Sequence, residues 1–192
     1  MTVTEMKPIA VVQSRVRLRV EDYLLLDRSG AFADYAKTEL IEGEVLYVNA
    51  QHRPHARVKT RLYRLLADAL DALEIGLEAL VEASVEITPE NAPEPDIVLT
   101  YLPNGEGLVP LGSVALIVEV SDATLDIDLG RKATLYATHG IPEYWVIDVA
   151  GRVIHRMSTP SGGGYGERAA VAFGEMIASV TVAGLNVETG AL

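Results

Sequence analysis

A glutamate interrupts the most apolar segment of this chain, and this feature most restricts what the chain can fold into. Residues 115–120 read Ala-Leu-Ile-Val-Glu-Val, a short run rich in β-branched residues. Such a run is typical of a strand that is covered on both faces of a sheet. A carboxylate is almost never fully buried without a partner, because an uncompensated buried charge is very costly. The sequence therefore predicts a Lys, an Arg or a metal ion beside Glu119.

Two more charged residues extend this pattern on either side of the central strand. Upstream, the run Pro-Asp-Ile-Val-Leu places Asp96 at the mouth of a second apolar strand. Downstream, a helix is predicted over residues 126–139, where Lys132 shares an inward stripe with Leu129 and Tyr136. Asp, Glu and Lys in this order, on two strands and a helix, indicate a metal-dependent phosphodiesterase site.

The remaining pattern predicts a mixed α/β fold, with a mixed central β-sheet flanked by helices. With 192 residues the chain is long enough for a substantial core. We expect a tail over residues 1–19 and a single domain over residues 20–192. The predicted elements are a helix over 20–27, a hairpin over 39–48, a helix from Pro54 to Leu73 ended by Gly76, strands over 77–88, 96–101, 114–120, 143–148 and 152–157, a flexible connector over 161–164, and a closing strand that includes 179–182.

The composition limits the kinds of protein that this chain can be. No apolar run approaches the roughly eighteen residues that span a bilayer, and the first ten residues lack the apolar core of a signal peptide. We therefore expect no membrane partner. The absence of cysteine excludes disulfides and cysteine-ligated zinc, and it fits a cytoplasmic protein. The net charge of −11 argues against a protein that coats nucleic acid without specificity.

Basic residues are nevertheless concentrated in the first half of the predicted long helix. Arg53, Arg57 and Arg61 occur there together with Lys59 and Arg64, and no acid lies among them. They form either a strip that contacts DNA phosphates or the solvated face of a helix. In the first case we expect Arg53, Arg57 and Arg61 to bind nucleic acid.

Cleavage of a phosphodiester requires a neutralised phosphate and a nucleophilic water molecule, and a divalent ion held by oxygen ligands supplies both. Asp96 and Glu119 offer hard oxygen ligands on rigid neighbouring strands, and the backbone carbonyl of Val120 offers a third. Lys132 is then the group that orients or deprotonates the water, or that stabilises charge in the transition state. The alternative is a buried ion pair between Glu119 and Lys132, with neither metal nor reaction.

Three further residues are candidates for accessory roles in the same site. Glu44 either reaches the metal, directly or through water, or is an ordinary acid of the hairpin. His55 opens the long helix, where it either contacts a phosphate or the metal or has a structural role. Asp128 stands four residues before Lys132, so it either orients this lysine or is simply an acid at the start of a helix.

The chain resembles the Uma family of "putative restriction endonucleases", in the PD-(D/E)XK nuclease superfamily. The matching residues are Glu-Leu-Ile-Glu-Gly-Glu at 39–44, His55, Pro-Asp at 95–96, Val-Glu-Val at 118–120, Asp-Leu-Gly-Arg-Lys at 128–132 with Tyr136, and Gly-Ile-Pro-Glu-Tyr-Trp-Val-Ile-Asp at 140–148. The resemblance covers residues from about 20 to 182. It implies a core sheet flanked by helices, a Mg²⁺ or Mn²⁺ site, and hydrolysis of DNA phosphodiesters.

The chain departs from the superfamily pattern at one position. In that pattern a lysine stands two residues after the second acid, where this chain has Ser121. The resemblance implies that the lysine has moved to the following helix, which makes Lys132 its counterpart.

We therefore expect an endonuclease that acts on DNA with Mg²⁺ or Mn²⁺, with Asp96, Glu119 and Lys132 as its catalytic residues. A two-fold homodimer would cut both DNA strands most easily. The rival hypothesis is a non-catalytic binding module of the nuclease fold, or a homo-oligomeric scaffold, that keeps Glu119 and Lys132 as a buried pair. The net charge of −11 favours this rival.

Overall fold

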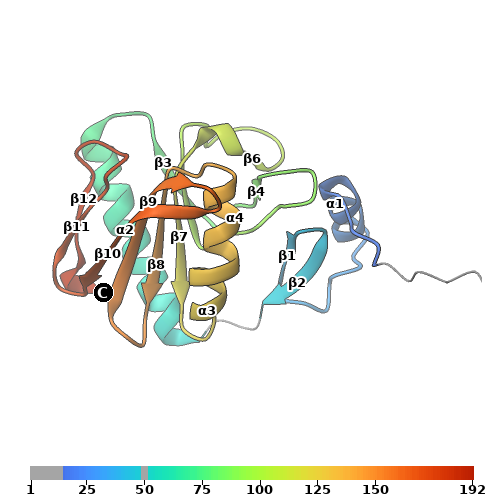
Figure 1. Ribbon diagram of the computed structural model, residues 1–192, viewed down its shortest axis with the longest axis horizontal. Helices are drawn as coiled ribbons and strands as arrows, with labels where there is room; N and C mark the ends of the chain where they lie inside the picture. Colours follow the sequence, from blue (N-terminus) through green and yellow to red (C-terminus); the bar gives the residue numbers. More distant parts are fainter. Residues whose placement is uncertain (1–14, 49–51) are drawn as a thin grey trace, which may run out of the picture.

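The computed structural model describes residues 15–48 and 52–192, and its centre is a six-stranded sheet (Figure 1). The strands are Glu78–Val81 (β3), Ile97–Thr100 (β5), Val114–Ser121 (β7), Glu143–Asp148 (β8), Val153–Ser161 (β9) and Gly164–Ala172 (β10). They lie in the order β10-β9-β8-β7-β5-β3. Neighbours β7 and β8 are parallel and the other pairs are antiparallel, so the predicted mixed sheet is confirmed.

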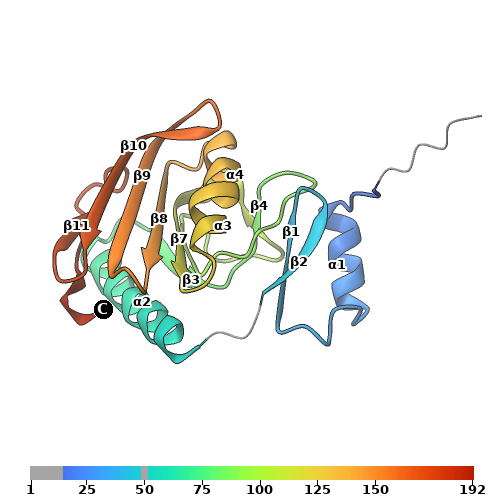
Figure 2. The same ribbon diagram turned by 60° about the horizontal axis from the view of Figure 1, so that its bottom comes forward.

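Helices cover both faces of this sheet. The long helix α2 (Arg53–Leu73) lies on one face, and α3 (Leu125–Ile127) and α4 (Ala133–Thr138) lie on the other (Figures 1 and 2). A π-helical segment, Asp128–Lys132, joins α3 to α4. The predicted arrangement of a sheet between helices is therefore confirmed.

Strand β7 is buried along its whole length, as the apolar run predicted. Leu116 and Val118 pack in one cluster with Leu62 of α2, whereas Ile117 packs in a second cluster with Tyr136 of α4. Alternate residues of the strand thus face opposite helical layers.

Helix α2 follows the predicted apolar stripe. Val58, Leu62, Leu66 and Leu70 are buried against the sheet, and the amphipathic spacing explains why. The helix ends at Leu73, as predicted. Its left-handed cap is Glu74 rather than Gly76.

A hairpin and a short helix flank the sheet on the side of α3 and α4 (Figure 2). They are β1 (Lys37–Ile41), β2 (Glu44–Val48) and α1 (Val20–Arg28), close to the predicted bounds. Glu42 and Gly43 both have positive φ and form the two-residue turn of the hairpin. A bridge between Leu40 and Ala92 ties β1 to the rest of the chain.

The remaining elements are short. They are β4 (Val85–Glu86) paired with β6 (Val109–Pro110), β11 (Met176–Ala178) paired with β12 (Asn186–Glu188), and 3₁₀ turns at Leu111–Ser113 and Thr189–Ala191.

Three predicted segments differ from the structure. The single strand predicted over 77–88 is wrong, because Glu82 has a φ of 53° and the chain turns there between β3 and β4. The flexible connector predicted over 161–164 is a tight turn of the β9–β10 hairpin, with positive φ at Gly162 and Gly163. The closing strand predicted over 179–182 is absent from that part of the described chain, and β11 ends just before it.

The segment 179–182 instead surrounds a buried carboxylate. Glu143, at the start of β8, has no exposed surface. Its Oε2 accepts hydrogen bonds from the Ser179 hydroxyl (2.6 Å), the Val180 amide (3.0 Å), and the amide and hydroxyl of Thr181 (3.1 and 2.7 Å). Its Oε1 accepts one from the Trp145 indole at 2.6 Å. The loop therefore has a fixed conformation without belonging to the sheet.

The tail expected over residues 1–19 lies outside the described residues as far as residue 14. In the part of the chain that the structure describes, no helix combines the length and the apolar character needed to cross a membrane.

Candidate active site

Asp96 and Glu119 lie opposite each other across β5 and β7. Ile97 pairs with Val118 in the antiparallel ladder; Asp96 directly precedes Ile97, and Glu119 directly follows Val118. The Val120 amide donates a hydrogen bond of 2.8 Å to Asp96 Oδ2. Asp96 is 5% exposed and Glu119 is 4% exposed. The structure thus brings together the two carboxylates that the sequence offered as ligands.

Lys132 is the positive partner of Glu119. Its Nζ lies 3.0 Å from Glu119 Oε1 and 3.1 Å from Glu39 Oε2. The Tyr136 hydroxyl donates a hydrogen bond of 2.9 Å to the same Glu119 oxygen. All four side chains are buried. One ammonium therefore serves two carboxylates, one on the central sheet and one on the hairpin.

The π-helical segment positions Lys132 for this contact. A π-turn inserts an extra residue into a helix and is frequent at functional sites. Asp128 opens the segment, and its Oδ2 accepts hydrogen bonds of 2.6 Å from Ser121 and from Thr124. Because Ser121 ends β7, these bonds fix the start of the helix to the strand that carries Glu119. Asp128 acts on Lys132 through its charge, since its carboxylate is bound by the two hydroxyls.

The charges of this cluster change the proton affinities of its members. Burial alone would lower the pKa of Lys132, but the negative charges of Glu119, Glu39 and Asp128 outweigh it and raise that pKa above its ordinary range. Burial raises the pKa of Glu119 to about 8, although the Lys132 ammonium opposes this rise. Two acids share one ammonium, so the cluster retains a proton on a carboxyl more readily than an exposed glutamate does.

Asp96 has the opposite behaviour. Burial would raise its pKa, but the hydrogen bond from His55, the charges of Lys37 and His55, and the Val120 amide outweigh burial and lower its pKa to about 2. His55 Nε2 lies 3.4 Å from Asp96 Oδ2, and Lys59 Nζ lies 3.3 Å from Oδ1. Asp96 is therefore an ionised carboxylate at neutral pH.

One ring nitrogen of His55 is buried without a hydrogen-bond partner among the described residues. This nitrogen is Nδ1, which is shielded from solvent. The imidazole thus turns its Nε2 to Asp96 and leaves its second nitrogen without a bond.

Other residues considered from the sequence lie apart from this cluster. Glu44 belongs to a surface network of ion pairs and not to the cluster around Lys132. Its Oε1 lies 3.1 Å from Arg15 Nη1, and its Oε2 lies 3.6 Å from Arg131 Nη2. Arg53 and Arg57 are exposed near the start of α2. Arg61 is half-buried and donates a hydrogen bond to the carbonyl of Ala191.

Sequence reasoning missed Glu39 and Lys59 as members of the cluster. Glu39 follows Lys37 and Thr38 and precedes Leu40-Ile41 in β1, so only the apolar pair beside it hints at burial. Lys59 stands three residues before Leu62 of the apolar stripe of α2, at a spacing that predicts an inward position. Only the tertiary arrangement brings either residue to the central strands.

The carboxylates fit a magnesium-type ion better than a closed metal cage. Among residues 15–48 and 52–192, no three Asp, Glu, His or Cys side chains converge as a ready-made ligand set. Mg²⁺, however, keeps several water ligands and is usually held by one or two carboxylates together with substrate phosphate. Asp96 and Glu119 supply such hard oxygen donors from neighbouring strands. The contacts of Glu119 with Lys132 and Tyr136 use Oε1, which leaves Oε2 outside them.

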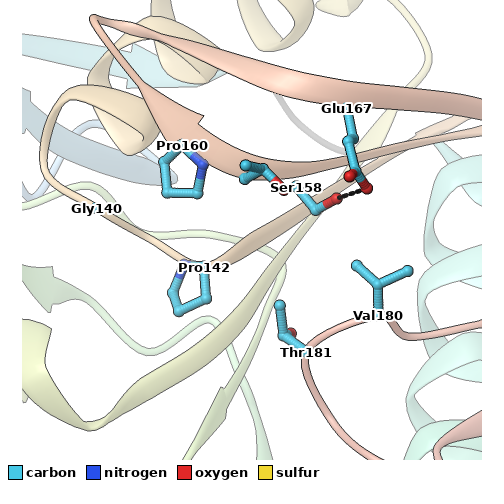
Figure 3. Close-up of a pocket in the computed structure, with 8 residues that line it drawn as sticks. Gly140, Pro142, Ser158, Pro160, Glu167, Val180 and Thr181 are labelled. Atoms are coloured by element: carbon cyan, nitrogen blue, oxygen red, sulfur yellow. Dashed lines mark hydrogen bonds between the residues drawn. The ribbon is translucent and has the colours of Figure 1, made fainter.

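A separate hollow of about 430 Å³ opens beside the Glu143 loop (Figure 3). Ser158 and Glu167 line it from β9 and β10, and their side chains are hydrogen-bonded at 3.4 Å. Pro142 and Thr181 complete the other side (Figure 3). None of its lining residues belongs to the acid–lysine cluster, so the chemistry of that cluster does not extend to this hollow.

Comparisons with known proteins point to one family. The sequence profile of the Uma2 family, described as "Putative restriction endonuclease", matches residues 20–190. No curated protein matches the chain. Among solved structures, the chain is similar to a protein from Anabaena variabilis described as a "putative nuclease belonging to DUF820". The two share 13% sequence identity and a TM-score of 0.65, over 91% of this chain and 96% of the other. At this identity the likeness shows a shared fold.

Proposed function

The chain belongs to the Uma2 family, as its sequence motifs indicated, and from this premise we propose that it is a divalent-metal-dependent endonuclease that hydrolyses DNA phosphodiester bonds. One observation carries the proposal. Asp96 and Glu119 lie next to the paired residues Ile97 and Val118 of neighbouring strands, and the Lys132 ammonium is bound to Glu119. Two carboxylates and a lysine in this relation suit phosphodiester hydrolysis.

Asp96, Glu119 and the carbonyl of Val120 are the proposed ligands of Mg²⁺ or Mn²⁺. When bound, such an ion neutralises charge on the phosphate and lowers the pKa of a water molecule. The rigid strands keep the two carboxylates apart from solvent and in a fixed relation. The hydrogen bond from the Val120 amide and the contact with His55 orient Asp96 before any ion arrives.

Lys132 acts in this proposal as a donor of charge and hydrogen bonds. Because its neighbours raise its pKa, the amine stays protonated at neutral pH. A protonated amine cannot remove a proton from water, so charge stabilisation and orientation of the attacking water are favoured over deprotonation by Lys132. The Tyr136 hydroxyl steadies the Glu119 oxygen that this ammonium also binds.

The proposed substrate contacts lie on α2. Arg53 and Arg57 are exposed on the first turns of the helix whose His55 and Lys59 reach Asp96. Cations at these positions would hold a DNA phosphate close to the carboxylates. Arg61 is bound to the Ala191 carbonyl and would contribute less.

Two further parts of the proposal concern assembly and location. A two-fold dimer would present two such sites to opposite DNA strands, so a homodimer is the proposed active form. The lack of cysteine suits a reducing compartment, and the proposed location is the cytoplasm.

The experiment is cleavage of supercoiled plasmid by purified protein with Mg²⁺, Mn²⁺ or EDTA. Wild type should nick or linearise the plasmid with either ion and not with EDTA. Asp96→Asn, Glu119→Gln and Lys132→Met should each abolish cleavage. Glu78→Gln, which changes an exposed acid on β3, should cleave at the wild-type rate.

Absence of cleavage by wild type with both ions would contradict the proposal. The rival hypothesis, a non-catalytic binding module or scaffold of the nuclease fold, would then be favoured. The two contacts of Lys132 with Glu39 and Glu119 favour that rival, because they satisfy the buried charges without a metal.

A further inference from the structure

One lysine of the basic strip is not on the surface. Arg53, Arg57 and Arg64 of α2 are exposed, whereas Lys59 is only 7% exposed. A buried lysine needs a charged partner, because an unpaired buried ammonium is very costly. Lys59 lies on the turn of the helix that follows His55, and both side chains reach the same carboxylate.

The Lys59 ammonium lies between two acids of different exposure. Its Nζ is 3.3 Å from Asp96 Oδ1 and 2.6 Å from Glu82 Oε1. The Glu82 side chain is 44% exposed, whereas that of Asp96 is 7% exposed. The Glu82 amide donates a hydrogen bond of 3.2 Å to the Asp96 carbonyl, so the two acids are adjacent on neighbouring chain segments.

We propose that Lys59 is a positioning residue that holds the Asp96 carboxylate in place and competes with the divalent cation for it. Glu82 is the second partner, which keeps the ammonium when a cation takes Asp96. This inference rests on the proposed function, because it requires Asp96 to be a metal ligand.

The two lysines of the site differ in how easily they can move. Both partners of Lys132 are buried, so leaving either one strands a charge in the interior. Lys59 can leave Asp96 while keeping its contact with Glu82, which solvent reaches. A divalent cation on Asp96 would repel an ammonium a few ångströms away. Lys59 therefore lowers the affinity of the site for the cation, and it also holds the Asp96 carboxylate in a fixed position.

The test is Mn²⁺ binding without DNA, measured by the loss of the free Mn²⁺ signal in electron paramagnetic resonance. Lys59→Met should bind Mn²⁺ at least about tenfold more tightly than wild type, because the competing charge is gone. Lys59→Arg keeps the charge and should bind like wild type. Arg64→Met removes an exposed charge from the same helix and should also bind like wild type.

A purely structural role for Lys59 predicts the opposite sign. Loss of order at Asp96 would then weaken Mn²⁺ binding in Lys59→Met, and equal or weaker binding overturns the inference. If wild type itself binds no Mn²⁺, the proposed metal dependence fails and this inference fails with it. If wild type binds and cleaves while Lys59→Met shows unchanged affinity, only the role of Lys59 is wrong.

A second variant keeps the inference testable if Lys59→Met does not fold. Glu82→Gln changes a half-exposed side chain and removes the partner that retains the ammonium. It should weaken Mn²⁺ binding by several fold, both in dilute buffer and at about 0.5 M salt. Glu78→Gln, on the edge strand that ends just before Glu82, is the matched control for charge acting through solvent, which salt screens. A Glu82→Gln deficit that disappears at high salt contradicts the inference.

Discussion

Glu39 and Lys132 are joined by an ion pair of 3.1 Å, although one belongs to the β1–β2 hairpin and the other to the helix over the central sheet. The hairpin is a separate two-stranded sheet, so this contact ties it to the core. It also places a second carboxylate on the ammonium that serves Glu119. The stability of this region and its charge balance therefore depend on the same lysine.

Loss of Lys132 should destabilise the fold strongly. Lys132→Met leaves Glu39 and Glu119 buried around an apolar side chain, and breaking a buried pair in this way costs about 3–5 kcal/mol. Urea unfolding followed by circular dichroism measures the loss. The double variant Lys132→Met/Glu39→Gln should recover a large part of it, because it removes a carboxylate left without its ammonium, whereas Glu119 holds a proton up to about pH 8. A double variant no more stable than the single one would contradict this account.

The stability of the wild type should fall as the pH rises through the neutral range. The pKa of Glu119 is raised from its ordinary 4.5 to about 8 in the folded chain, so the folded protein keeps a proton that the unfolded chain releases. This contribution is fully present below pH 4.5 and is lost as the pH rises toward 8, on the order of a few kcal/mol. Glu119→Gln cannot titrate, and its stability should vary less between pH 5 and pH 8, measured by urea unfolding. Parallel pH profiles for the two proteins would refute the prediction.

Asp96 should show the reverse dependence at acid pH. Its pKa is lowered from 3.8 to about 2, so the folded protein holds the ionised carboxylate more strongly than the unfolded chain does. The resulting stability, about 2 kcal/mol, is present above pH 3.8 and is lost as the pH falls through 2. Asp96→Asn has no carboxylate at this position, so it lacks this contribution to stability. The gap in unfolding free energy between wild type and Asp96→Asn should therefore narrow between pH 6 and pH 2.5.

DNA binding should depend on the first turns of α2. If Arg53 and Arg57 each neutralise one phosphate, the double variant Arg53→Ala/Arg57→Ala should reduce the slope of log affinity against log salt by about 2. Fluorescence anisotropy with a labelled duplex, at several salt concentrations, measures this slope. Arg168→Ala, in the exposed part of β10, is the control for a general loss of positive charge. An unchanged slope in the double variant would contradict the proposal that Arg53 and Arg57 contact DNA phosphates.

Local patterns were sufficient for the elements that carry the central charges. The apolar run around Glu119 predicted a buried strand with a positive partner, and the helical spacing predicted an inward Lys132. Both inferences needed only neighbours in sequence, because burial on both faces and the period of a helix are local signals. The bounds of β8 and the end of α2 followed from the same kind of signal.

The members of the cluster that arrive from a distance were not predictable in this way. Glu39 reaches Lys132 only because the hairpin docks beside α4, and no periodicity within the hairpin encodes that docking. The basic neighbours of Lys59 predict that it belongs to an exposed strip, whereas the structure buries it. The break at Glu82 is not predictable from the sequence either, because a non-glycine residue with positive φ has no strong sequence signature.

The buried carboxylate of Glu143 joins two parts of the chain that are far apart in sequence. Ser179, Val180 and Thr181 donate four hydrogen bonds to its Oε2, although they stand 36 to 38 residues later in the sequence. Until this segment folds against β8, Glu143 lacks these four hydrogen bonds, and burying a carboxylate without them is costly. Glu143 therefore couples the closing of the sheet at β8 to the folding of the segment 179–181.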